Sequence, residues 1–80
     1  MTAFPTEQDL HDHFAHCVQV FGGPTAASRR LGIDERAIRR FVSGERPLGP
    51  TLLEDTAKAL RALVAEATAA IASISPPGDA

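Results

Sequence analysis

The chain has few of the features that anchor or cross-link a protein. Its 80 residues include one cysteine, Cys17, so no disulfide can form within the chain. No apolar run approaches the roughly 20 residues that cross a bilayer, and the amino terminus has no basic segment followed by an apolar one. We therefore expect a cytoplasmic protein that does not use a membrane.

Motifs for catalysis are also missing. The sequence has no phosphate-binding glycine loop, no serine with plausible histidine and carboxylate partners, and no paired carboxylates in a predicted cleft. These absences predict a non-enzyme that needs no cofactor. A chain of 80 residues forms one small domain that buries only about 60 to 65% of its chain surface, so association with a second copy would add stability.

Basic charge is scarce overall but concentrated in one segment. The net charge of −2 argues against a protein that coats nucleic acid nonspecifically, because such proteins are usually strongly basic. Residues 24–47 hold six arginines against three acidic residues, a local balance of +3. Residues 1–23 have three acidic residues and no lysine or arginine, and residues 48–80 have a balance of −2. A specific anionic partner would therefore meet the middle of the chain.

Hydrophobic periodicity predicts an all-α fold, a compact domain of about four helices over residues 7–63. The first helix is expected over about residues 7–21, with Thr6 as its N-cap and Gly22 at its end. Pro24 opens the second helix, at a position where its missing amide costs nothing. The apolar stripe of the first helix, expected to pack on the next two, consists of Leu10, Phe14, Cys17, Val18 and Phe21.

Residues 24–44 predict two short amphipathic helices around a glycine-centred turn. Gly32 can adopt a positive φ and end one helix, and Asp34 can cap the next. At about 100° per residue, the second of these helices has two distinct faces. The apolar face holds Ala37, Ile38, Phe41 and Val42, and the opposite face holds Arg36, Arg39, Arg40 and Ser43. A purely basic outer face indicates an anionic partner or an acidic neighbour, and otherwise a solvated surface.

Ser28 is followed four positions later by Gly32, and Gly32 is followed six positions later by the β-branched Ile38. Phe41 is followed three positions later by Gly44. This pattern resembles that of the Cro-like and phage-repressor-like helix-turn-helix family, in which a small residue, a glycine and a β-branched residue have the same spacing. The resemblance covers about residues 10–60 and implies a sequence-specific DNA-binding transcriptional regulator. Small members of the family often bind their own promoters, and a chain this short would repress by covering a promoter.

In such a regulator the helix over residues 34–43 would enter the major groove. Arg36 is the expected base reader, because its planar fork matches the O6 and N7 acceptors of guanine. One of Arg39 and Arg40 would read a base while the other holds phosphate, and Glu35 would accept from the N4 amine of cytosine or repel wrong sites. Contacts to the DNA backbone are expected from Thr25, Arg29, Ser43 and Arg46.

One position departs from the family pattern. Pro24 stands where the family often has a glutamine that touches DNA, and proline has no side-chain donor. That contact is therefore absent or is made by Thr25.

A long final helix is expected from Pro50 to about Ile74. Its early part closes the core, whereas residues 64–75 form an extension for dimerisation, and residues 1–6 and 76–80 are expected to be flexible. Apolar residues follow a heptad spacing at Leu53, Ala57, Leu60, Val64, Ala67, Ile71 and Ile74. The expected homodimer interface is Leu60, Val64, Ala67, Ile71 and Ile74, with the two helices parallel or antiparallel. The alternative is that this segment folds back on the first helix.

A two-fold dimer would place its reading helices in successive major grooves about 34 Å apart. The expected partner is then double-stranded DNA with an inverted-repeat operator whose half-site centres lie about 10 to 11 base pairs apart. The rival interpretation is an antitoxin-like or adaptor protein that works mainly by protein–protein interaction through the final helix.

A histidine-rich stretch raises a separate possibility. His13 lies three residues before His16 and four before Cys17, so these side chains, with His11 nearby, would converge on a zinc or nickel ion. Because Cys17 lies on the apolar stripe and no second ligand cluster follows, we favour a polar helix face beside a buried thiol. No metal is therefore predicted.

Overall fold

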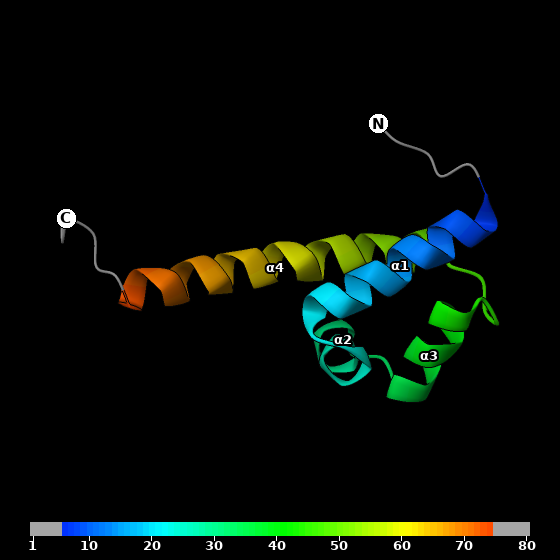
Figure 1. The fold of residues 1–80 in the computed structure, drawn as a ribbon, viewed down its shortest axis with the longest axis horizontal. Helices are drawn as coiled ribbons and strands as arrows, with labels where there is room; N and C mark the ends of the chain where they lie inside the picture. Colours follow the sequence, from blue (N-terminus) through cyan, green and yellow to red (C-terminus); the bar gives the residue numbers. More distant parts are fainter. Residues whose placement is uncertain (1–5, 75–80) are drawn as a thin grey trace.

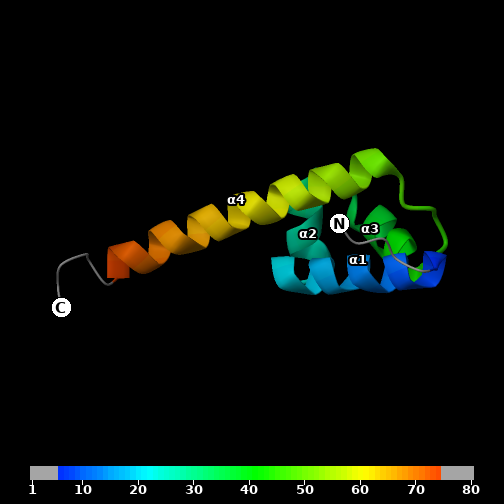
Figure 2. The same ribbon diagram turned by 90° about the horizontal axis from the view of Figure 1, so that it is seen from above.

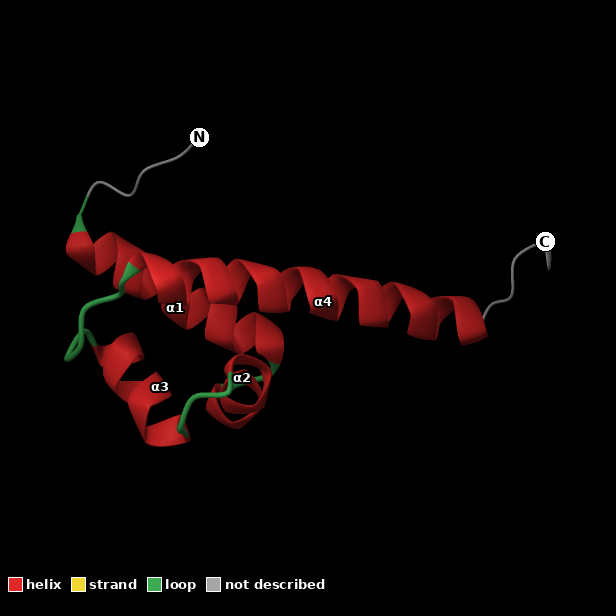
Figure 3. Ribbon diagram, turned by 180° about the vertical axis from the view of Figure 1, so that it is seen from behind, coloured by secondary structure: helices red, strands yellow, loops and turns green. Residues whose placement is uncertain are grey.

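The computed structural model of the chain describes residues 6–74, and these contain four α-helices and no β-strand (Figure 3). The helices are α1 (Glu7–Phe21), α2 (Pro24–Leu31), α3 (Glu35–Ser43) and α4 (Pro50–Ile74), as Figure 1 shows. The all-α class with a long C-terminal helix is thereby confirmed. Of the ends expected to be flexible, residues 1–5 and 76–80 lie outside the described residues, as does residue 75 of the expected extension. Thr6, the last residue of the expected flexible N-terminus, is instead the N-cap of α1.

The helix boundaries follow the local signals in the sequence. The Thr6 hydroxyl accepts a hydrogen bond of 3.0 Å from the Asp9 amide and so caps α1. Pro24 is the first residue of α2, and Gly32 ends that helix with φ +67°, a conformation that glycine adopts without steric cost.

One expected cap is wrong. Asp34 occupies the N-cap position of α3, but its side chain makes no capping hydrogen bond. Asp34 is exposed, and water is the acceptor expected for the free amides at this helix end.

The core lies between α1 and the α2–α3 pair. An edge-on contact between Phe14 and Phe41, with ring centroids 6.1 Å apart, joins α1 to α3. Leu48 in the loop before α4 is also buried, which its place among glycine and proline residues did not suggest. The buried cluster consists of Phe14, Val18, Phe21, Ala27, Ile38 and Leu48.

The two halves of α4 have different surroundings. Its first half packs on the core through half-buried side chains, including Leu52 and Leu63, and its buried Thr56 hydroxyl donates to the Leu52 carbonyl. From Val64 to Ile74 every residue is exposed, and Figure 2 shows this half extending past the other three helices. The fold-back alternative is therefore wrong. None of the helices in residues 6–74 has the length and apolarity of a membrane span.

Candidate nucleic-acid interface

The turn between α2 and α3 is held by Ser28. Its carbonyl accepts hydrogen bonds from the amides of Gly32 (2.9 Å) and Ile33 (3.2 Å), and its hydroxyl donates to the Ile33 carbonyl. Ala27 and Ile38 are completely buried on the facing sides of the two helices. A small residue at position 28 therefore both allows the close helix contact and fixes the turn, which sets the direction in which α3 is presented.

Helix α3 has the two faces that its sequence predicts. Ile38 is buried and Ala37, Phe41 and Val42 are half-buried, whereas Arg36, Arg39, Arg40 and Ser43 are exposed. The three guanidinium groups lie on a helix of nine residues, about 13 Å long. Positive charge is thus concentrated along one short, solvent-facing ridge.

Glu35 neutralises part of this ridge. Its carboxylate accepts a hydrogen bond of 2.7 Å from Arg39 Nη2 and one of 3.1 Å from the Thr25 hydroxyl. Arg36 and Arg40 form no ion pair or side-chain hydrogen bond within residues 6–74. Of the three arginines on α3, these two are therefore available to an external anion without breaking an internal contact.

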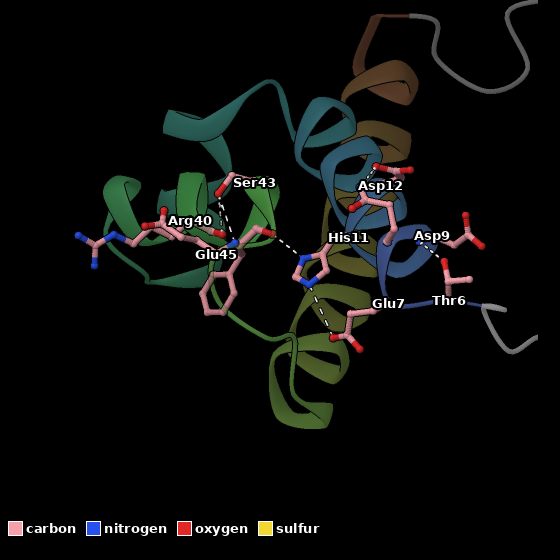
Figure 4. Close-up of polar contacts among 10 residues, drawn as sticks. Thr6, Glu7, Asp9, His11, Asp12, Arg40, Ser43 and Glu45 are labelled. Atoms are coloured by element: carbon pink, nitrogen blue, oxygen red, sulfur yellow. Dashed lines mark hydrogen bonds and ion pairs between the residues drawn. The ribbon is translucent and has the colours of Figure 1, made fainter.

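The carboxyl end of α3 is closed by local contacts. The Ser43 hydroxyl donates to the Arg40 carbonyl (3.1 Å) and accepts from the Glu45 amide (3.4 Å). The Arg46 guanidinium lies 5.0 Å from the centroid of the Phe41 ring. Figure 4 shows the Arg40 side chain extending away from α1 beside these contacts. Ser43 is therefore committed to closing the helix end, and Arg46 lies over an aromatic face next to the ridge.

His11 joins α1 to this end of α3, a role that the sequence interpretation missed. It is buried, its Nδ1 donates to the Phe41 carbonyl at 2.7 Å, and its Nε2 lies 3.7 Å from the Glu7 carboxylate (Figure 4). The signal was present in the spacing, because His11 lies three residues before Phe14 on the buried side of α1. The imidazole therefore fixes the carboxyl end of α3 against α1.

The arginines of α2 are divided between two environments. Arg29 is exposed and forms no ion pair within the described residues. Arg30 donates two hydrogen bonds, of 2.8 and 2.7 Å, to the Glu66 carboxylate on α4. The hydrogen bonds from Arg30 lower the pKa of Glu66, and those to Glu66 raise the pKa of Arg30. Of these two arginines, Arg29 is therefore the one whose charge is not paired within residues 6–74.

The histidines and the cysteine do not form a metal cluster in the described part of the chain. No group of three or more histidine, cysteine or acidic side chains converges there. The rings of His13 and His16 lie 6.1 Å apart, and Cys17 is buried in the apolar stripe. Burial raises the pKa of the Cys17 thiol, which keeps it in the less nucleophilic protonated form.

Comparisons with known proteins do not identify a relative. No protein-family model matches the chain, and no curated protein or solved structure shows significant similarity to it. What the chain does must therefore be inferred from its own side chains.

Proposed function

We propose that this protein is a sequence-specific DNA-binding transcriptional regulator, which binds an inverted-repeat operator as a homodimer and represses by covering a promoter. The observation that carries the proposal is the outer face of α3. Two exposed arginines without internal partners, Arg36 and Arg40, lie there on a helix fixed by a tight turn to α2. An α-helix fits the major groove of B-DNA, where arginine recognises guanine.

The roles of the side chains follow from their surroundings. Arg36, in the first turn of α3, is the principal base reader, and Arg40 either reads a base or holds phosphate. Arg39 is held by Glu35, so it contacts DNA only where a phosphate or a base replaces Glu35 as its partner. Arg46 lies next to the ridge and suits a backbone phosphate, and the exposed Arg29 on α2 is a second candidate for such a contact. Thr25 must leave Glu35 to contact DNA.

The proposed dimer uses the exposed half of α4. Val64 and Ile71 are each 64% exposed and Ile74 is 81% exposed. Ala67 lies between them on the same face, and the half-buried Leu60 continues the stripe into the globule. Apolar residues at heptad spacing on a helix with no neighbour favour pairing with a second helix.

The test is DNA selection from a random duplex pool, followed by mobility shifts on the selected site with excess nonspecific competitor. We expect an inverted repeat, with affinity that falls steeply with salt, because each neutralised phosphate contributes a slope of about −0.9 in a log–log plot. DNA just upstream of the protein's own gene is the first natural sequence to assay. Selection of no common sequence would overturn the proposal.

Arg36→Ala is the decisive variant, and Arg61→Ala is its matched control. Both remove one exposed arginine, but Arg61 lies on α4 away from the reading helix. Arg36→Ala should weaken binding to the selected site by roughly 5- to 150-fold and relax its sequence preference, whereas Arg61→Ala should change neither substantially. Equal effects of the two variants would contradict the assignment of α3 as the reading helix.

The alternative function is an antitoxin-like or adaptor protein, and the exposed apolar face of α4 is the observation that favours it. A partner protein held by that face would respond little to salt, whereas DNA binding would respond strongly. Ile71→Asp should break the protein contact first and lower DNA affinity only through loss of the dimer. Ala69→Asp, which places the same charge on the opposite side of α4, is the control.

A further inference from the structure

An apolar groove runs between α1 and α4 on the globular part of the molecule. Its volume is about 550 Å³, and its lining is mainly apolar, although Glu7 and His13 of α1 also contribute to it. The apolar lining includes Leu10, Phe14 and Cys17 from α1 and Leu53, Ala57 and Leu60 from α4. The three α4 residues belong to the heptad stripe that continues into the exposed half of that helix. The groove and the exposed stripe are therefore one continuous apolar surface. Residues 53–60 of α4 line its groove, and residues 64–74 form its projecting part.

The exposed half of α4 requires an uncharged partner. Among residues 64–74 the only charged side chain is Glu66, and Arg30 of the same chain already holds it through two hydrogen bonds. Eight of these eleven residues are alanine, valine or isoleucine, and all eleven are exposed. A helix of this composition gains by burying its apolar stripe against another apolar surface.

The stripe is complementary to itself when two α4 helices run in opposite directions. If Leu60 lies opposite the partner's Val64, the heptad spacing places Ala57 opposite the partner's Ala67 and Leu53 opposite the partner's Ile71. The small residues then meet each other and allow close helix approach, and the large residues meet on either side of them. The two-fold axis of this pairing crosses α4 at the level of position 62, although the Ala62 side chain is on the opposite face of the helix.

We propose that the protein dimerises with antiparallel α4 helices, and that residues 64–71 of each copy lie in the α1–α4 groove of the other. This inference rests on the proposed homodimer and specifies its geometry. A parallel pair would match each stripe residue with its own copy and would leave both grooves empty. The antiparallel pair fills both grooves and covers both projecting halves, because the projecting half of each α4 lies in the groove of the other copy.

Cysteine cross-linking without DNA distinguishes the two arrangements. In a Cys17→Ala background, Ala57→Cys and Ala67→Cys are made separately, mixed and mildly oxidised. The antiparallel register predicts a disulfide between the two different variants. Each variant alone should remain uncross-linked, because position 57 is then about 15 Å along the helix axis from the partner's position 57, beyond the reach of a disulfide.

Several outcomes would overturn the proposal. Cross-linking of each variant with itself would show a parallel pair, and a mass of 8.5 kDa by light scattering at high micromolar concentration would show a monomer. Ala62→Cys, on the outer face of α4, is the control for random collision and should not cross-link. Circular dichroism of each variant establishes that it folds, and the mass of the unmodified chain tests the dimer even if a variant fails.

The cross-linking result is independent of DNA binding. If the mixed variants cross-link as expected but the dimer selects no DNA sequence, the proposed regulator function fails and the dimer geometry stands. If the dimer selects an operator but each variant cross-links with itself, the geometry fails and the function stands.

Discussion

Arg30 on α2 and Glu66 on α4, 36 positions apart in the sequence, are joined by two hydrogen bonds of 2.8 and 2.7 Å. This ion pair lies where α4 leaves the globular part, just beyond Leu63, the last half-buried residue of the helix. Two parallel hydrogen bonds fix direction as well as distance. The contact therefore orients the projecting half of α4 relative to the α2–α3 unit.

The Arg30–Glu66 contact should make stability depend on pH in the acid range. The pKa of Glu66 is lowered in the folded protein from an ordinary value of 4.5, so its stabilising effect is fully present above that value. The effect is lost as the pH falls through the lower folded value, because the carboxyl then binds a proton. Glu66→Gln should lower Tm near neutral pH, and the difference from the unmodified chain should shrink in acid.

Thermal unfolding followed by circular dichroism over a range of pH measures this difference. Glu54→Gln is the control, because Glu54 is an exposed acid on α4 that forms no ion pair within the described residues. A Tm difference for Glu66→Gln that stays constant from neutral to acid pH would show that the contact does not stabilise the fold through the charge of Glu66.

Gly32 should be intolerant of a side chain because of its backbone conformation. Its φ is +67°, and an added Cβ would meet no atom within 4 Å, so the cost is conformational rather than steric crowding by neighbours. Gly32→Ala should lower the free energy of unfolding by about 1 to 2 kcal/mol. Gly49→Ala is the control, because Gly49 has equal space around it without a positive φ. Urea denaturation of both variants should separate them; equal stability would contradict the prediction.

His11 should contribute to stability through its hydrogen bond to the Phe41 carbonyl. His11→Leu fills this buried position with an apolar side chain and removes the donor, so the carbonyl retains the Gly44 amide at 3.3 Å. We expect a loss of about 1 kcal/mol in the free energy of unfolding. His16→Leu, at an exposed position of the same helix, should have little effect in the same urea titration. A comparable loss in both variants would show that the hydrogen bond is not the cause.

The helices and the two faces of α3 were predictable because their determinants are local. The cap at Thr6, the positive φ of Gly32 and the spacing around Ile38 depend on residues within a few positions along the chain. The exposure of residues 64–74 was also predictable, since a domain this small has no surface left to cover them.

The contacts between distant residues were not predictable in the same way. Arg30 reaches Glu66, 36 positions away, because α4 passes beside α2, which only the packed structure determines. His11 was grouped with the other histidines by sequence proximity, whereas burial separates it from them. The pairing of Glu35 with Arg39 did carry a local signal, the spacing of four residues on one helix.

Glu35→Gln tests whether Glu35 limits binding to wrong sites, by holding Arg39, or reads cytosine directly. Its carboxylate holds Arg39 at 2.7 Å, so Glu35→Gln removes the ion pair and frees Arg39 for phosphate. If Glu35 acts by restraint, the variant should bind DNA of many sequences more tightly, with a salt slope steeper by about 0.9. Glu45→Gln makes the same change of charge in the loop after α3 and controls for net charge. Weaker binding of Glu35→Gln to the selected operator, with loss of preference for cytosine, would instead make Glu35 a base-reading residue.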